Sequence, residues 1–193
     1  MTPARRGKRE KIVSIFGSYT AGTGKTLYAQ AYALGHALAE AGYTVANGGY
    51  GGTMEAGARG AKEAGGRTIG VTCRRFAGRG GRRPQANPWI DEEIHEDDPL
   101  ERTRTMVRLA CAFIALPGGT GTLTEWAVAW EYVCKRLVRP KPIFLLGDFW
   151  KPAVEPVLAL RPRDGEHLHF VDSPAQIVAV LRDRAVGVQT VSG

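Results

Sequence analysis

Short apolar stretches alternate with helical patterns along almost the whole chain. The first apolar stretch, 11–16 (KIVSIF), precedes residues 27–40, where leucine and alanine recur at the spacing of one helix face. Continuous β-branched runs of this kind are typical of buried strands. The same alternation predicts further strands over 43–46, 67–72, 112–116, 142–146 and 168–171, a short strand around Ile94, and helices over 54–64, 99–109, 122–136, 150–160 and 174–181.

This order of elements predicts a fold class. Parallel strands need crossover connections, so strands alternating with helices indicate an α/β fold, a Rossmann-like doubly wound parallel sheet with helices on both faces. Ligands bind such a sheet at the carboxyl ends of its strands, so we expect function in the strand-to-helix loops. A length of 193 residues fits one domain, which we assign to 11–185, with a disordered basic tail over 1–10 and a C-terminal tail over 186–193.

The composition of the chain limits the kinds of partner that we expect it to bind. The net charge of +7 comes mainly from an N-terminal basic run and a loop with arginines between 74 and 83. No aromatic residues interleave with these charges, so we expect no nucleic-acid partner, with polyanion binding by the basic loop as the alternative. No apolar run reaches the roughly 18 to 20 residues of a membrane helix, and no signal-peptide core follows the N-terminus. We therefore expect no membrane partner and a cytoplasmic location.

Metal and disulfide chemistry have little support in the sequence. Cys73, Cys111 and Cys134 are far apart and odd in number, which predicts reduced, mostly buried thiols. His167 and His169 share one face of a predicted strand and indicate a surface pair, not a metal site. We expect no metal.

The segment Gly24-Lys25-Thr26 has the ending of an ATP-binding loop. That loop requires a glycine five positions before its Gly-Lys pair, and this chain has Tyr19 there. Tyrosine would strain the tight turn that wraps a phosphate. We therefore favour a strand-to-helix turn, with an ATPase that depends on Lys25 as the alternative.

The segment 117–125, PGGTGTLTE, is the strongest candidate for a ligand site. Glycines at Gly118, Gly119 and Gly121 let the backbone approach a ligand closely. The helix expected near Thr122 presents unpaired amides and roughly half a positive charge, which attract phosphate. Thr120 and Thr122 add hydroxyl donors.

Glu125 and Arg102 are the candidate reactive side chains. Thr122 and Glu125 match a capping box, in which the glutamate only bonds its own backbone. The alternative is that Glu125 points sideways, toward an uncharged or cationic part of a ligand. Arg102 lies in the first turn of the preceding helix, at the same rim of the sheet, where it would clamp a phosphate or steady a carboxylate.

Three segments together resemble a known family. PGGTGTLTE (117–125), the pair Glu101-Arg102 and GGYGGTMEAGARGAKEAGGRTIGV (48–71) resemble the Lonely Guy (LOG) family, often mislabelled as lysine decarboxylases. The resemblance runs from about residue 11 to about 181. It implies a homodimeric hydrolase, without a cofactor, that cleaves the N-glycosidic bond of nucleoside 5′-monophosphates such as cytokinin riboside monophosphates or AMP.

The resemblance also implies roles for single residues. Arg102 and Glu125 match catalytic positions of the family. Chemistry agrees, because the bond breaks through an oxocarbenium-like sugar that a carboxylate stabilises. Positions expected to bind the phosphate or nucleotide are Gly17, Ser18, Gly48, Gly49, Gly52, Met54, Pro117, Gly118, Gly119, Thr120, Gly121 and Thr122.

Departures from the family pattern leave an alternative function open. Asn47 and Glu55 stand where the family has glycine, and Thr103 replaces a lysine. These changes point to a less-studied branch, with a nucleotide- or molybdopterin-cofactor carrier without turnover as the alternative. Trp126 and Trp130 form one helix stripe, which predicts core or dimer interface, with a base-stacking platform as the minor alternative.

Overall fold

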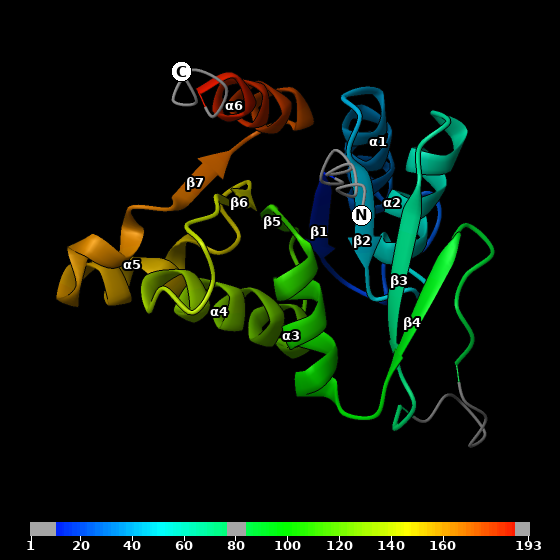
Figure 1. Cartoon of the computed structure of the whole chain (residues 1–193), viewed down its shortest axis with the longest axis horizontal. Helices are drawn as coiled ribbons and strands as arrows, with labels where there is room; N and C mark the ends of the chain where they lie inside the picture. Colours follow the sequence, from blue (N-terminus) through cyan, green and yellow to red (C-terminus); the bar gives the residue numbers. More distant parts are fainter. Residues whose placement is uncertain (1–10, 77–83, 188–193) are drawn as a thin grey trace, which may run out of the picture.

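The computed structural model describes residues 11–76 and 84–187 (Figure 1). Seven strands form one parallel sheet in the order β4-β3-β2-β1-β5-β6-β7. The strands are β1 (Ile12–Phe16), β2 (Thr44–Asn47), β3 (Thr68–Cys73), β4 (Glu92–Glu96), β5 (Ala112–Ala115), β6 (Ile143–Leu146) and β7 (Leu168–Val171). The helices are α1 (Thr26–Glu40), α2 (Thr53–Glu63), α3 (Pro99–Leu109), α4 (Thr120–Cys134), α5 (Lys151–Leu160), the 3₁₀ helix η2 (Pro162–Gly165) and α6 (Pro174–Gly187).

Helices cover both faces of the sheet, which confirms the predicted doubly wound fold. One core cluster joins α1, α2 and α6 to one face, and the other joins α3, α4 and α5 to the opposite face (Figure 1). Neighbouring side chains of a strand divide between the two: Val13 and Ile15 belong to the first cluster, and Ile12 and Phe16 to the second. This is the alternation expected of a strand buried on both sides.

The strand order reverses direction at β1, which pairs with β2 on one side and β5 on the other. The chain leaves β1 toward α1 on one face and leaves β5 toward α4 on the other. Diverging loops at such a switch point open a crevice at the carboxyl edge of the sheet. The expected ligand region therefore lies between the ends of β1 and β5.

The edge strand β4 is the strand predicted around Ile94, and it pairs in parallel with β3. Arg74 and Arg75 lie just after β3 and pair with Asp97 (3.1 Å) and Asp98 (3.7 Å). The rest of the basic loop, Arg79, Arg82 and Arg83, lies outside the described residues, as do the expected tail 1–10 and the segment 188–193.

Several sequence predictions can now be compared with the fold. Trp126 and Trp130 are buried in the core beside Trp150, so the base-stacking platform is wrong for them. Of the three cysteines, only Cys73 is buried and Cys111 is exposed, so the prediction of mostly buried thiols was wrong. Within the described part of the chain, no cluster of three metal-ligating side chains occurs.

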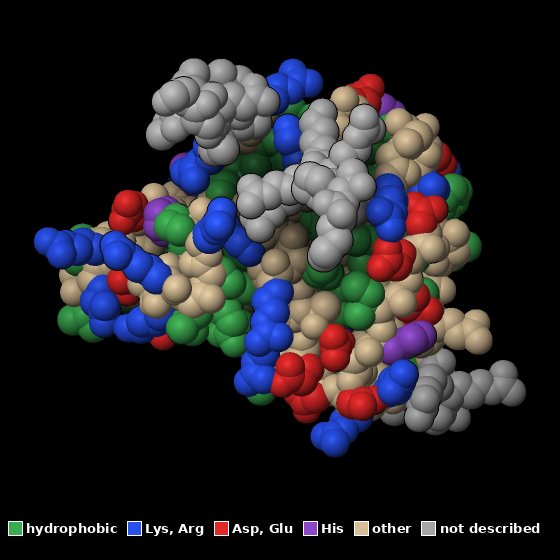
Figure 2. Space-filling view, viewed as in Figure 1, with side chains coloured by type: hydrophobic (Ala, Val, Ile, Leu, Met, Phe, Trp, Pro, Cys, Tyr) green, Lys and Arg blue, Asp and Glu red, His purple; other side chains and the backbone are tan. Residues whose placement is uncertain are grey.

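The surface charge is dispersed on the face shown in Figure 2. Lys and Arg side chains gather around α5, whereas Asp and Glu gather where β4 leads into α3. Among the described helices, none has the length and hydropathy needed to cross a membrane.

Candidate active site

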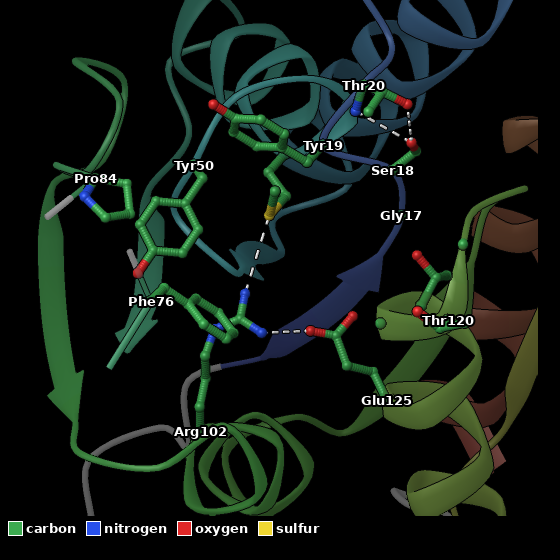
Figure 3. Close-up of a pocket in the computed structure, with 14 residues that line it drawn as sticks. Gly17, Ser18, Tyr19, Thr20, Tyr50, Phe76, Pro84, Arg102, Thr120 and Glu125 are labelled. Carbon is green, nitrogen blue, oxygen red and sulfur yellow. Dashed lines mark hydrogen bonds and ion pairs between the residues drawn. The ribbon is translucent and has the colours of Figure 1, made fainter. Parts of the chain in front are cut away.

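A cavity of about 560 Å³ lies at the carboxyl edge of the sheet, between the loops that follow β1 and β5 (Figure 3). A volume of this size suits a small ligand. Its walls come from five segments of the chain that are distant in sequence. The lining residues are Gly17, Ser18, Tyr19, Thr20, Tyr50, Met54, Phe76, Pro84, Arg102, Gly119, Thr120, Gly121, Thr122 and Glu125.

An ion pair between Arg102 and Glu125 lies on one side of this cavity (Figure 3). Nη1 of Arg102 donates a hydrogen bond to Oε1 of Glu125 at 2.5 Å, and Nε donates to the carbonyl of Val71 at 2.6 Å. The guanidinium carbon lies 5.8 Å from the ring centre of Tyr50 and 5.6 Å from that of Phe76. Arg102 is 6% exposed and Glu125 9%, so both charges are largely removed from water.

The first turn of α3 delivers Arg102 to this position. Asp98 caps the helix by accepting a hydrogen bond from the Leu100 amide at 2.8 Å, and Pro99 occupies the first helical position, as predicted. Gly48 leaves the space that the guanidinium fills, because a Cβ there would lie 1.6 Å from Nη2 of Arg102. Any side chain at Gly48 would displace the arginine.

Burial and charge act in opposite directions on Glu125. Removal from water raises the pKa of the Glu125 carboxyl, and the charge and hydrogen bond of Arg102 partly oppose that rise. A carboxyl with a raised pKa is a better proton acceptor once ionised than an exposed glutamate. Perturbed groups in a cavity of this kind are typical of functional sites.

The capping-box interpretation of Glu125 does not hold in the structure. Helix α4 begins at Thr120, two residues earlier than expected, with Gly119 as its cap and no side chain capping it. The carboxylate bonds Arg102 instead of its own backbone. The first amides of α4 consequently face the cavity without intrahelical partners. A Cβ at Gly119 or Gly121 would meet nothing within 4 Å, so both border open space.

The loop after β1 lines the cavity and is held firmly by hydrogen bonds. The carbonyl of Ser18 accepts hydrogen bonds from the Thr53 amide (2.9 Å) and hydroxyl (3.2 Å). The hydroxyls of Ser18 and Thr20 lie 2.9 Å apart, and the Thr20 amide donates to the Ser18 hydroxyl at 3.2 Å. These two hydroxyl side chains lie on the same side of the cavity as Thr120 (Figure 3).

The glycine-rich loop after β2 braces the site from behind. The side-chain amide of Asn47 donates to the Met54 carbonyl (3.0 Å), and its oxygen accepts from the Gly49 amide (2.8 Å). Gly49 and Gly52 have φ of +78° and +68°, which favour glycine. Asn47, which departs from the family pattern, therefore holds the turn in shape. Met54 reaches the cavity, where its sulfur lies 4.0 Å from Nη2 of Arg102.

The structure brings nine of the predicted site residues together around one cavity. Arg102, Glu125, Gly17, Ser18, Met54, Gly119, Thr120, Gly121 and Thr122 line it. Gly48, Gly49, Gly52, Pro117 and Gly118 do not line it, because they support the loops or contact protein atoms. The sequence analysis missed Thr20, Tyr50, Phe76 and Pro84, and regarded Tyr19 only as an obstacle to an ATP-binding loop.

Lys25 lies outside this cavity. It is exposed and precedes the first residue of α1, so Gly24-Lys25-Thr26 forms the predicted strand-to-helix turn. The ATPase alternative required Lys25 at a phosphate site, and the cavity residues do not include it.

The fold and the cavity define a Rossmann-like α/β protein with a ligand site at the switch point of its sheet. Residues 10–178 match the model of the SLOG cluster4 family, and the chain belongs to that family. This result agrees with the resemblance to the LOG family.

This chain resembles an uncharacterized protein, a phosphoribohydrolase and a molybdenum cofactor binding protein. It is 36% identical over 115 residues to an uncharacterized protein of Archaeoglobus fulgidus, covering 60% of this chain and 71% of the relative. It is 39% identical over 98 residues to a cytokinin riboside 5′-monophosphate phosphoribohydrolase of Mycobacterium tuberculosis, covering half of each chain. The structure of the molybdenum cofactor binding protein from Rippkaea orientalis superposes with a TM-score of 0.72 at 26% identity, covering 92% of this chain and 98% of that one.

Proposed function

We propose that the protein hydrolyses the N-glycosidic bond of a nucleoside 5′-monophosphate, releasing the free base and ribose 5-phosphate. The observation that carries this proposal is the buried pair of Arg102 and Glu125, placed beside a cavity with hydroxyl and amide donors at one end and aromatic side chains at the other. The similarity to a phosphoribohydrolase over half of the chain supports it.

The 5′-phosphate would bind at the start of α4. The amides there lack intrahelical partners, and Thr120 and Thr122 line the same wall. Ser18 and Thr20 supply two further hydroxyls from the loop after β1, on the same side of the cavity. Fixed donors of this kind hold the sugar in place by binding energy, which lowers the entropic part of the barrier.

With the phosphate at α4, the anomeric carbon would lie near Glu125. One carboxylate oxygen bonds Arg102, and the other is turned away from the guanidinium (Figure 3). In the proposed step a water attacks C1′ and passes a proton to this free oxygen. The bond from C1′ to the base breaks at the same stage, and the base leaves with the electron pair and takes up a proton from solvent. Glu125 then returns its own proton to solvent, which restores the carboxylate. The carboxylate also stabilises the positive charge that develops on the sugar.

Arg102 would act by positioning Glu125. Its hydrogen bond to the Val71 carbonyl and its contacts with the neighbouring rings of Tyr50 and Phe76 fix the guanidinium. A carboxylate tied to so rigid a partner has little freedom to turn away from the sugar.

The direct test incubates the purified protein with AMP and with N6-isopentenyl-AMP and measures free base and ribose 5-phosphate. The Glu125→Gln variant should lose about 100-fold or more of the rate, because general-base groups contribute roughly that much. Glu131→Gln is the matched control, since Glu131 is an exposed glutamate of the same helix. Equal rates for Glu125→Gln and Glu131→Gln would exclude the role given to Glu125.

A second candidate function is a carrier that binds a nucleotide or the molybdenum cofactor without turnover. The similarity to a molybdenum cofactor binding protein over nearly the whole chain favours it. A carrier would retain its ligand through gel filtration, bind it equally well after Glu125→Gln, and release no base with either protein. Measuring ligand retention and base release for both proteins therefore distinguishes a carrier from a hydrolase.

We also propose that the protein works as a homodimer. Leu137 and Leu160 expose large apolar side chains that a second copy would cover. Light scattering would then give a mass twice the 20.8 kDa of one chain.

A further inference from the structure

We infer that this site recognises a base through its flat faces, with Tyr19 as the stacking surface, and does not read the edge of the base. This inference rests on the proposed function and names its substrate class: 5′-phosphorylated nucleosides with varied flat bases, including bases that carry apolar substituents.

The cavity has two chemically different ends (Figure 3). Ser18, Thr20 and Thr120 lie at one end, and Tyr50, Phe76 and Pro84 lie at the other beside Arg102, with Tyr19 and Glu125 between the two ends. A ligand whose phosphate occupies the hydroxyl end therefore places its base among the aromatic side chains. Aromatic faces attract any base, because every base has a π-face.

Tyr19 has the features of a stacking residue. It is 65% exposed although it lines the cavity, so its ring is available to a ligand. The backbone beside it is fixed, because Ser18 accepts two hydrogen bonds from Thr53. The ring lies over Gly51, where a Cβ would be in ordinary van der Waals contact with Cε2 of Tyr19 at 3.5 Å. Because the loop is already rigid, little conformational entropy is lost when a base stacks on this exposed ring.

The side chains around the aromatic end offer few groups that could read a base edge. The hydroxyl of Tyr50 is occupied, since it donates to the Cys73 carbonyl (3.2 Å) and accepts from the Cys73 amide (2.8 Å). Phe76 and Pro84 have no polar side-chain atoms. Nε and Nη1 of Arg102 bond the Val71 carbonyl and Glu125, whereas Nη2 lies 4.0 Å from the Met54 sulfur. Strong discrimination between bases needs edge groups that are left unpaired by the wrong base. Among the described lining residues at this end, Nη2 of Arg102 and the Tyr19 hydroxyl are the polar side-chain groups that these bonds leave, too few to match the whole edge of one base.

An apolar substituent on the base should be favourable here. Met54 and Phe76 line the cavity with apolar atoms, and burying apolar surface stabilises a complex. A purine with an N6-isopentenyl group should therefore bind at least as tightly as AMP, although no side chain is dedicated to it.

Calorimetry with the wild type, Tyr19→Ala and Tyr19→Phe tests the inference, with AMP, GMP, N6-isopentenyl-AMP and ribose 5-phosphate as ligands. The wild type should bind AMP and GMP within about threefold of each other, because only the faces are recognised. Tyr19→Ala should lose about tenfold in affinity for all three nucleotides, the typical loss when one stacking partner of a base is removed. It should bind ribose 5-phosphate as the wild type does, and Tyr19→Phe should bind every ligand normally.

Four results would overturn the inference. A large preference between AMP and GMP would mean that the edge is read. Equal loss for ribose 5-phosphate and nucleotides in Tyr19→Ala would mean that Tyr19 only supports the loop. A loss in Tyr19→Phe would assign the effect to the hydroxyl. Wild-type binding of ribose 5-phosphate as tight as that of AMP would remove the base subsite and leave the proposed phosphate site intact, whereas no binding of any ligand would remove both.

Discussion

Two glycine-rich loops follow parallel strands in this protein, and their glycines have different neighbours. In the loop after β2, Gly48 and Gly52 lie against protein: a Cβ at Gly48 would meet Arg102, and one at Gly52 would lie 2.2 Å from the Ser18 carbonyl. After β5, Gly119 in the loop and Gly121 in the first turn of α4 border open space, whereas a Cβ at Gly118 would lie 2.2 Å from Oγ1 of Thr122. Glycine is needed in the first loop because of the protein's own atoms, and in the second to leave room beside the first amides of α4.

This difference separates two kinds of glycine that look alike in a sequence. Substitution in the first loop should disturb the reactive pair or the fold even without a ligand. Substitution of Gly119 or Gly121 should leave the free protein unchanged and act only on what enters the cavity. Glycine content alone therefore does not locate a phosphate site.

The largest expected effect is that of Gly48→Ala. The added Cβ would displace the Arg102 guanidinium, which is the flexible end of a long side chain, so the fold should persist. Displacement of a positioning group by about 1 Å costs roughly 100-fold in rate. Hydrolysis of AMP should fall by that factor, while circular dichroism and the melting temperature change little. Normal activity in this variant would show that hydrolysis does not depend on the present position of the Arg102 guanidinium.

Gly119→Ala tests the other loop and should have a smaller effect. A methyl group there contacts no protein atom, so the melting temperature should match that of the wild type. It would obstruct one charge-assisted hydrogen bond to a phosphate, and affinity for ribose 5-phosphate should fall about tenfold. Calorimetry measures this directly. Unchanged affinity would place the phosphate elsewhere.

The pH dependence of hydrolysis should report the environment of Glu125. Burial raises the pKa of its carboxyl, and the proposed reaction needs the ionised form. As pH falls, activity should therefore be lost at a higher pH than an ordinary glutamate, with a pKa of about 4.3, would give. The ligand phosphate also titrates, near pH 6. Binding of AMP to Glu125→Gln over the same pH range measures the effect of the phosphate titration alone. If that effect accounted for the whole pH dependence of hydrolysis, the role given to Glu125 would be contradicted.

The smallest expected effect is that of Lys25→Ala. Lys25 is exposed and does not line the cavity, although it belongs to the segment that most resembles an ATP-binding loop. Affinity and hydrolysis should stay within twofold of the wild type. Magnesium-dependent ATP hydrolysis that disappears in this variant would restore the ATPase alternative.

The alternation of strands and helices and the placing of Arg102 and Glu125 at one rim of the sheet could be predicted because their signals are local. Apolar runs define buried strands, and a parallel sheet places the following loops at one edge. The start of α4 was placed two residues late because Thr122 resembles a cap, whereas Gly119 occupies that position.

The aromatic end of the cavity could not be predicted in this way. Tyr50 is fixed by the backbone of Cys73, which is 23 residues further along the chain. Gly48 is required because the Arg102 guanidinium, from a distant segment, occupies the space beside it. Phe76 and Pro84 reach the cavity only when the sheet has formed. Contacts between distant segments leave no periodic pattern, so local spacing gives no sign of them.

The pairing of Arg102 with Glu125 has a consequence for ligand exchange. These are the two charged side chains among the described lining residues, and they neutralise each other, so a phosphate would be held by dipoles and not by a free cation. Ionic strength weakens attraction between exposed charges far more than short-range hydrogen bonds. The sugar phosphate would therefore dissociate without breaking an ion pair, and its binding would vary little between dilute buffer and concentrated salt.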